Sequence, residues 1–316
     1  MKVSPKEVAL VAIFAALSWI ASKFVPGIPI IGAEGSTISW DASLAPIYGI
    51  ILGPYLGFAA ALIGGLVAAG SLFTVLTSFC TGISAFVAGM LTDKSKKPYG
   101  WIVAAAVIAL LLAGWYATDV GRTAPFYPLL HFAGLVIAIS TGGWIADKVT
   151  EGKSEEMSKL TVKLDARYIA LGIVLLFAGF VVYVRHGALV NALGGAELAS
   201  ATLSFTAYAL LIAGALSAIY GVFSWIKPGF VTAIALACYA GIIADHMLGN
   251  LIFLGMIDVV VPALKDAPSD VIAGIFMSVL PISAVERTLF TAIATIIAVA
   301  LLPTLRRAGI IYRKSQ

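Results

Sequence analysis

The chain has 316 residues, of which 61% are hydrophobic and only 11% are charged. A soluble domain typically carries about 25% charged residues, so this composition excludes a water-soluble globular protein and indicates an integral membrane protein. The net charge of +4 does not point to nucleic acid, because positive residues in a membrane protein set its orientation. Cys80 and Cys238 both lie in apolar runs, so we expect neither a disulfide framework nor a metal site.

Ten apolar stretches are candidate membrane helices, judged against the roughly 20 residues that a helix needs to cross a bilayer. Gly53 and Pro54 separate the second stretch, which is short, from the third, because proline disfavours helix at the residue before it. We therefore predict an all-α integral membrane protein with about ten transmembrane helices. The expected helices lie near 7–25, 41–53, 54–72, 73–92, 100–118, 124–146, 167–185, 199–225, 229–252 and 279–304.

The positive residues predict the orientation of these helices. With both termini in the cytoplasm, most of the 20 Lys and Arg residues fall on the inner side, which is the usual bias of a cell-membrane protein. Arg287 lies inside a span, and the few outer positives are Lys23, Arg122, Arg185 and Lys265. No cleavage site of the signal-peptide kind precedes Lys23, so we expect the first helix to be retained.

The connecting segments indicate which functions the chain can perform alone. The polar run 147–159 mixes both charge signs and is expected to be a solvated cytoplasmic connector. No nucleotide-binding motif occurs, so any ATP that drives transport is hydrolysed by another chain, and we expect no cofactor. The outer segment 26–41 contains Glu34, Trp40 and Asp41 among apolar and turn residues, which favours a lid over structural cover alone.

Small residues recur at helical spacing in two places. Ala12 and Ala16 are four apart in the first helix, and Gly49, Gly53 and Gly57 are four apart around the Pro54 break. Such faces let two membrane helices approach closely. The partner helix can belong to the same chain or to another protein, and spacing does not distinguish these alternatives.

Ionisable residues inside spans are costly, on the order of 3 kcal/mol each, and are functional candidates by default. Helix nine contains Asp245, His246 and Asn250, and the last helix contains Glu286 and Arg287. Counting residues from the helix ends, with the last span starting near Pro281, places both groups in the outer third of the membrane, under the 26–41 loop. We therefore expect one ligand site.

Two alternatives to a ligand site remain open. Asp245 with Arg287, and Glu286 with His246, could be ion pairs that only lock the last two helices together. The same groups could instead form a proton relay. His131 stands alone in the sixth helix and is expected to be a satisfied interior histidine.

Residues 7–95 and 229–308 resemble the substrate-binding S components of energy-coupling factor (ECF) transporters. The matching features are the alanine-rich first helix, the long outer loop, the run 44–57 around Gly53 and Pro54, and the fourth helix ending near residue 92. Members of that family have six helices, so the resemblance implies a division into S-component-like helices at 1–99, an inserted four-helix region at 100–228 with a cytoplasmic loop at 147–166, and closing helices at 229–316.

The resemblance implies a subunit that captures a small water-soluble vitamin on the outer face and reorients with a transmembrane coupling protein and two cytoplasmic ATPases. It also implies that Ala12 and Ala16 contact the coupling protein. On this hypothesis Arg287 pairs with a substrate carboxylate or phosphate and Trp40 covers the ligand. The residues Glu34, Asp41, Asp245, His246, Asn250 and Glu286 supply further polar contacts.

Other functions remain as alternatives. The chain could be an ion- or proton-coupled secondary transporter, although we find no internal repeat of the kind common in such folds. A membrane enzyme is disfavoured, because the acid-rich, zinc-helix and serine-nucleophile motifs are missing. A non-transporting subunit of a membrane complex is the last alternative, with the polar pairs purely structural.

Overall fold

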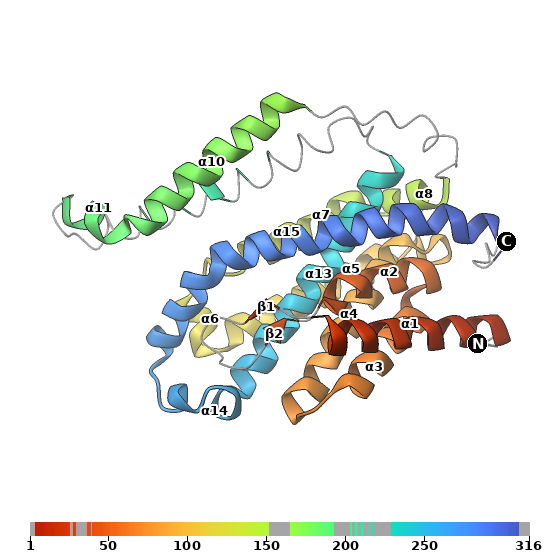
Figure 1. The fold of residues 1–316 in the computed structure, drawn as a ribbon, viewed down its shortest axis with the longest axis horizontal. Helices are drawn as coiled ribbons and strands as arrows, with labels where there is room; N and C mark the ends of the chain where they lie inside the picture. Colours follow the sequence, from red (N-terminus) through yellow and green to blue (C-terminus); the bar gives the residue numbers. More distant parts are fainter. Residues whose placement is uncertain are drawn as a thin grey trace. The chain divides into compact units, whose positions relative to one another are not determined.

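The computed structural model describes residues 4–25, 28–29, 37–38, 40–151, 165–192, isolated positions from 203 to 217, and 229–309. The described chain is helical apart from one short strand pair, in which β1 (Ile28–Pro29) runs antiparallel to β2 (Thr37–Ile38) (Figure 1). The chain separates into two compact units. The first comprises Met1–Glu155, Pro228–Met277 and Leu289–Gln316, and the second comprises Glu156–Lys227 and Ser278–Thr288.

The helices of the first unit follow one another through short connections. They are α1 (Pro5–Phe24), α2 (Asp41–Leu52), α3 (Pro54–Ala68), α4 (Leu72–Thr92), η1 (Lys94–Lys96), α5 (Gly100–Ala117), α6 (Asp119–Thr123), α7 (Leu129–Thr141), α8 (Trp144–Glu151), α13 (Phe230–Gly255), α14 (Ile257–Val260), η2 (Pro262–Leu264) and both ends of α15 (Ser269–Arg307). The second unit contains α10 (Ala166–Val184), α11 (His186–Ala192) and the middle of α15.

Local sequence explains where several helices begin and end. Ser4 and Ser71 cap α1 and α4, each accepting a backbone hydrogen bond from the residue three positions on, as polar N-caps do. Gly53 adopts a φ of 81°, a conformation that favours glycine, and ends α2 directly before Pro54 starts α3. The break predicted between the second and third helices is therefore confirmed.

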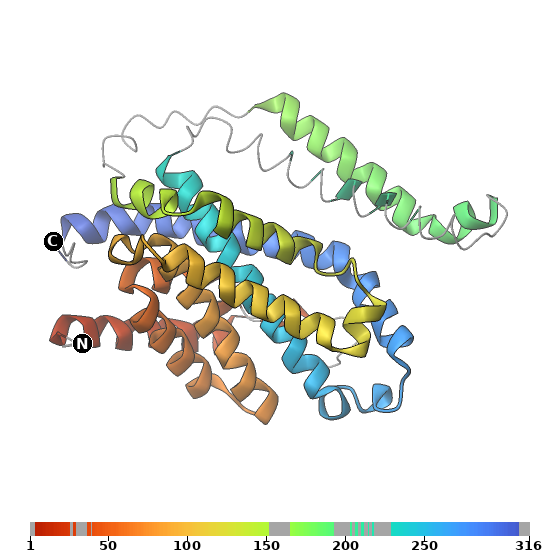
Figure 2. The same ribbon diagram turned by 180° about the vertical axis from the view of Figure 1, so that it is seen from behind.

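The core of the first unit lies where α13 packs against α4, with α2, α5, α7 and α8 also touching α13. Figure 1 shows α13 running past α2 and α4, and Figure 2 shows α5 and α7 side by side. Small residues make the close approach of α13 and α4 feasible. A Cβ on Gly241 of α13 would lie 2.6 Å from the Ser84 backbone oxygen of α4, so the two backbones nearly touch there.

The glycines of the α2–α3 turn pack in the same way. A Cβ on Gly49 would lie 1.8 Å from the Ala85 backbone oxygen, and one on Gly57 would lie 2.6 Å from the Gly49 Cα. A Cβ on Gly89 of α4 would lie 2.6 Å from the Pro54 Cα. These small residues serve packing within the chain, which was one of the two alternatives for this motif.

The second unit pairs α10 with residues described between 203 and 217. The Ser217 hydroxyl donates to the Tyr168 carbonyl oxygen at 3.1 Å. A Cβ on Gly179 would lie 2.8 Å from Leu211 Cγ, and one on Gly214 would lie 2.7 Å from the Leu176 backbone nitrogen. Residues near the start of α10 therefore contact the residues described near 217, and residues further along α10 contact those near 211. This is the pattern of two antiparallel segments.

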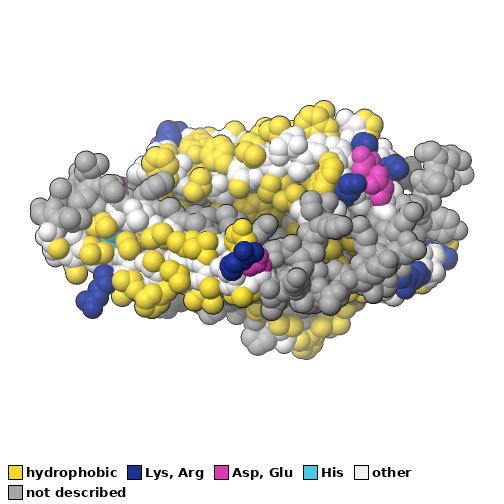
Figure 3. All heavy atoms as spheres, turned by 90° about the horizontal axis from the view of Figure 1, so that it is seen from above, with side chains coloured by type: hydrophobic (Ala, Val, Ile, Leu, Met, Phe, Trp, Pro, Cys, Tyr) yellow, Lys and Arg dark blue, Asp and Glu magenta, His cyan; other side chains and the backbone are white. Residues whose placement is uncertain are grey.

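Six helices in the described residues are long and apolar enough to cross a membrane, or seven if the bent pair α7–α8 counts as one span. The all-helical membrane fold is confirmed, with α2 and α3 as shorter apolar helices. Most of the span predicted near 199–225 lies outside the described residues. Figure 3 shows hydrophobic side chains over much of the described surface in that view, with charged ones in small groups, as expected for contact with lipid.

The single helix predicted near 124–146 is wrong. The chain forms α7 and α8 instead, which are bent by 75° at the Gly142–Gly143 break. Gly142 has a φ of 48°, a left-handed backbone conformation that glycine adopts more readily than other residues. The glycine therefore allows the bend. The polar connector expected from residue 147 also begins later, because α8 continues to Glu151 and Asp147 accepts an ion pair from Lys97 at 2.6 Å.

The last helix starts earlier than predicted. α15 begins at Ser269 and continues through Pro281, which was expected to mark the start of the span. Membrane helices tolerate proline because neighbouring groups can satisfy the freed backbone carbonyl. At 39 residues, α15 is about 58 Å long. Glu286 and Arg287 lie near the middle of this helix. Their predicted position in the outer third of the membrane assumed a helix start near Pro281, so it no longer follows.

Candidate functional site

The polar residues of α13 occupy its second half and face inward. Asp245 is 8% exposed and Asn250 is 9% exposed, while His246 is half-buried. Residues 246 and 250 are four apart, so the two side chains share a helix face. Burying these groups is costly unless they are hydrogen-bonded, and a tyrosine outside α13 supplies a partner for Asn250 and His246.

Tyr127, between α6 and α7, is the main partner of this face. The Asn250 side-chain amide donates to the Tyr127 hydroxyl oxygen at 3.1 Å, and His246 Nε2 lies 3.5 Å from the same oxygen. Tyr127 is 1% exposed, so these contacts are shielded from solvent and lipid. Sequence reasoning missed Tyr127, because no local signal relates it to a residue 123 positions away.

Aromatic rings surround this polar group. The His131 ring stacks on the His246 ring with centroids 5.1 Å apart, and the Tyr127 ring contacts Trp115 and Phe276, with centroids 4.8 and 5.0 Å away. His131 was expected to stand alone in the interior. It is buried, but it belongs to a cluster with Tyr127 and His246 rather than standing apart.

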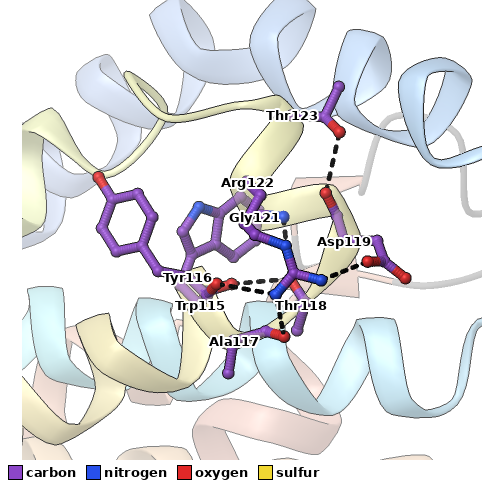
Figure 4. Close-up of polar contacts among 8 residues, drawn as sticks. All are labelled: Trp115, Tyr116, Ala117, Thr118, Asp119, Gly121, Arg122 and Thr123. Atoms are coloured by element: carbon purple, nitrogen blue, oxygen red, sulfur yellow. Dashed lines mark hydrogen bonds and ion pairs between the residues drawn. The ribbon is translucent and has the colours of Figure 1, made fainter.

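A tight turn after α5 holds one wall of this cluster (Figure 4). The Thr118 hydroxyl donates to the Trp115 carbonyl oxygen at 2.7 Å and accepts from the Gly121 backbone N–H at 2.9 Å. A Cβ on Gly121 would lie 1.9 Å from the Trp115 oxygen, so only glycine fits. Arg122 caps the end of α5 by donating to the Ala117 carbonyl oxygen at 2.9 Å, and it pairs with Asp119.

The lid residues are described only in part. Glu34 lies outside the described residues. Trp40 directly precedes α2 and packs edge-on against Phe290 of α15, with ring centroids 5.4 Å apart. Asp41 is the first residue of α2 and is buried, where the partial positive charge of the helix N-terminus favours a carboxylate. The strand pair brings the two arms of the loop together at Ile28 and Ile38.

Glu286 and Arg287 are both buried in α15, at 8% and 3% exposed. Arg287 Nη2 lies 3.5 Å from Glu286 Oε2, so these neighbours form an ion pair of opposite charge. They come one turn before Phe290 along the helix. A buried guanidinium beside a carboxylate can orient an oxygen-bearing ligand, because its several N–H donors are fixed in one plane.

Ala12 and Ala16 lie on the exposed face of α1. The opposite face, with Ala15 and Ser18, is buried against α3, where a Cβ on Gly64 would lie 2.4 Å from Ser18 Cβ. The alternative that Ala12 and Ala16 pack within the chain is therefore disfavoured among the described residues. Their face remains available to lipid or to another protein.

The side chains of the α13 cluster are suited to hydrogen-bonding a ligand. In the described ranges, no group of three or more His, Cys, Asp or Glu side chains is placed to hold a metal ion. The α13 cluster combines amide, imidazole, phenol and carboxylate groups with aromatic rings. Such a set can hold a small polar molecule through hydrogen bonds and ring contacts.

Comparison with known proteins identifies a family that matches the first part of the chain. Residues 2–151 match the family model of the ECF-type riboflavin transporter, S component. The match contains Ala12, Ala16, Trp40, Asp41 and Tyr127 and continues through α5 to α8, which the predicted division placed in the inserted region. It stops before α13 and α15. No curated protein and no solved structure matches the chain.

The match and the membrane-spanning helices agree with the resemblance found in the sequence. The match covers the first range of the resemblance, 7–95, which contains the alanine-rich helix, the outer loop and the Gly53–Pro54 break, and it does not reach the second range, 229–308. The chain is a multi-pass membrane protein. Through residues 2–151 it belongs to the S components of ECF transporters, which are the substrate-binding subunits of vitamin uptake systems and not enzymes.

Proposed function

We propose that this S component captures riboflavin or a closely related flavin at the outer face of the membrane. The match of residues 2–151 to the riboflavin-transporter S-component family carries this proposal. Asp245, His246 and Asn250 of α13 are the central contacts, with Trp40 covering the ligand. Further predicted contacts are Glu34, Asp41, Glu286 and Arg287.

The chemistry of a flavin fits these side chains. Riboflavin has a flat ring system with carbonyl and imide groups and a chain of hydroxyls, and it is uncharged near neutral pH. Aromatic rings such as Trp40 favour flat ligands, while amide and imidazole groups hydrogen-bond to carbonyls and hydroxyls. Arg287 was predicted to pair with a carboxylate or phosphate. For riboflavin it would donate to a carbonyl or hydroxyl oxygen, and for flavin mononucleotide it would meet a phosphate.

The proposal includes a topology of about ten membrane helices with both termini in the cytoplasm. The distribution of Lys and Arg supports it. The division at 1–99, 100–228 and 229–316 stays a prediction. Within it, we propose that the part inserted into the substrate-binding core is the stretch 156–227, since those residues form a separate compact unit whereas α5 to α8 pack with α4 and α13.

S components associate with the energy-coupling module, which contains a transmembrane coupling protein and cytoplasmic ATPases. We propose that the exposed Ala12–Ala16 face of α1 contacts the coupling protein. Small side chains on an exposed membrane helix favour close approach of another helix, because backbones can pack without intervening bulk.

Flavin titration of the purified protein tests the substrate. Riboflavin and flavin mononucleotide are added separately while flavin fluorescence is recorded, and small molecules released from the freshly purified protein are identified by mass spectrometry. Saturable one-to-one binding of riboflavin, or its release in stoichiometric amount, supports the proposal. Tighter binding of the mononucleotide that is lost in Arg287→Ala would assign Arg287 to the phosphate. A folded protein that binds neither flavin and releases none would overturn it.

Arg287→Ala and Arg122→Ala form a matched pair for the site assignment. Arg287 is a predicted contact and is buried in α15, whereas Arg122 is largely exposed and caps α5. We expect Arg287→Ala to weaken flavin binding at least tenfold, since a hydrogen bond to a charged group contributes about 1.5–3 kcal/mol, and Arg122→Ala to leave it unchanged. Equal loss in both variants, or loss in neither, would contradict the assignment.

A further inference from the structure

Tyr127 connects the polar face of α13 to a part of the chain that no sequence argument linked to substrate. Its hydroxyl oxygen accepts the Asn250 amide at 3.1 Å and lies 3.5 Å from His246 Nε2. One phenol oxygen thus contacts two of the three predicted substrate residues on α13.

The position of Tyr127 is itself tightly determined. Its ring packs against Trp115 at 4.8 Å and against Phe276 at 5.0 Å, and Trp115 is held by the Thr118 bond to its carbonyl oxygen. Gly121 lets the backbone close this turn. A buried side chain packed against two other rings loses rotamer freedom when the protein folds, so its hydroxyl is presented at a fixed place.

The hydrogen bond to Tyr127 fixes the orientation of the Asn250 side-chain amide. A side-chain amide has two N–H donors and one acceptor oxygen, and donation to Tyr127 fixes the plane of the group. One further N–H and the oxygen then point in set directions. A binding group that is already oriented does not lose conformational entropy when the ligand arrives, so affinity rises without a new ligand contact.

We propose that Tyr127 is a positioning residue of the substrate site, which orients Asn250 and His246 for the ligand without being required for folding. This inference rests on the proposed function, because it takes the α13 residues as substrate contacts. On this proposal, the region from α5 to α7 contributes to substrate binding and does not serve packing alone.

Tyr127→Phe and Tyr239→Phe test the proposal as a matched pair. Tyr239 also joins α13 to α7 through its hydroxyl, which donates to the Leu130 carbonyl oxygen at 3.0 Å, so its bond goes to the main chain of α7 rather than to the polar side chains of α13. Both substitutions keep the ring; Tyr239→Phe removes the bond to Leu130, and Tyr127→Phe removes the contacts with Asn250 and His246. We expect similar small losses of thermal stability, with about tenfold weaker riboflavin binding in Tyr127→Phe alone.

A double-mutant cycle separates positioning from general destabilisation. If Tyr127 acts through Asn250 as well as His246, Tyr127→Phe combined with Asn250→Ala loses less affinity for riboflavin than the sum of the two single losses. Fully additive losses of affinity would overturn the proposal. Equal losses of affinity in Tyr127→Phe and Tyr239→Phe would overturn it as well, because they would show a structural effect only.

The outcomes distinguish this inference from the function on which it rests. If Asn250→Ala weakens riboflavin binding and Tyr127→Phe does not, the positioning role is wrong while the proposed site stands. If Asn250→Ala has no effect, the α13 site is wrong and the positioning role falls with it. If the unaltered chain binds no flavin, the substrate assignment fails first, and this inference fails together with it.

Discussion

Two regions of the molecule have the same small-residue spacing but opposite surroundings. On α1, Ala12 and Ala16 are exposed, and the helix packs on α3 through its other face. Around the α2–α3 turn, Gly49 and Gly57 are buried in backbone-to-backbone contacts. The comparison teaches that four-residue spacing marks a helix suited to close approach without saying which helix approaches it.

The physical difference lies in what a methyl group would meet. At Gly49 a Cβ would lie 1.8 Å from a backbone oxygen, where no side chain can move aside. At Ala12 the methyl group is already present and meets no tight packing, because the position is exposed. The glycine motif is therefore needed for folding, and the alanine motif is free to serve association.

Gly49→Ala should have the largest effect. The added methyl group clashes with Ala85, so α2 and α4 must separate, and we expect a loss of about 3 kcal/mol in the free energy of unfolding. Thermal denaturation in detergent measures it. Gly274→Ala is the matched control, since a Cβ there has nothing within 4 Å and the helix should become slightly more stable. Equal stability of the two variants would contradict the close packing.

Gly64→Ala should have the next largest effect. It places a methyl group against Ser18 and Ala15 on the packed face of α1, and we expect a loss of about 2 kcal/mol. Hydrogen exchange of α1 amides measures how far the helix loosens. If exchange of α1 stays unchanged while the protein folds normally, the packing of α1 on α3 is not the contact described here.

Leucine in place of Ala12 and Ala16 should leave the free energy of unfolding within about 0.5 kcal/mol of the original. Co-purification with the coupling protein and ATPases should fall at least tenfold, about 1.4 kcal/mol, because the bulkier side chains keep the partner helix away. Ala106→Leu, on an exposed position of α5, is the control and should not affect co-purification. Full retention of the complex by the Ala12 and Ala16 variants would refute a docking role.

Ser4→Ala should have the smallest effect. It removes the capping box in which Glu7 N donates to the Ser4 hydroxyl at 3.3 Å, and we expect a loss of about 1 kcal/mol confined to the first turn of α1. Hydrogen exchange near Glu7 should quicken while the complex with the coupling module persists. A broken complex would mean that the first turn, rather than the Ala12–Ala16 face, carries the contact.

Much of the helical fold could be predicted because its signals are local. Apolar length predicted α1, α4, α5, α10 and α13 closely, and Gly53 with Pro54 predicted the break between α2 and α3. The bend between α7 and α8 was missed because apolar length alone predicts one continuous helix there. The signal for the break was the pair Gly142 and Gly143. The continuation of α15 through Pro281 was missed because a membrane environment tolerates a proline that would end a soluble helix.

By itself, the sequence determined that this protein lies in a membrane, which polar residues are costly to bury there, and which family residues 7–95 and 229–308 resemble. These conclusions follow from composition and from short-range patterns. Only the tertiary structure decided that Tyr127 and His131 join His246 and Asn250, and that Ala12 faces outward while Gly49 faces in. Such pairings depend on how helices far apart in the chain pack, and periodicity within one helix contains no information about its neighbour.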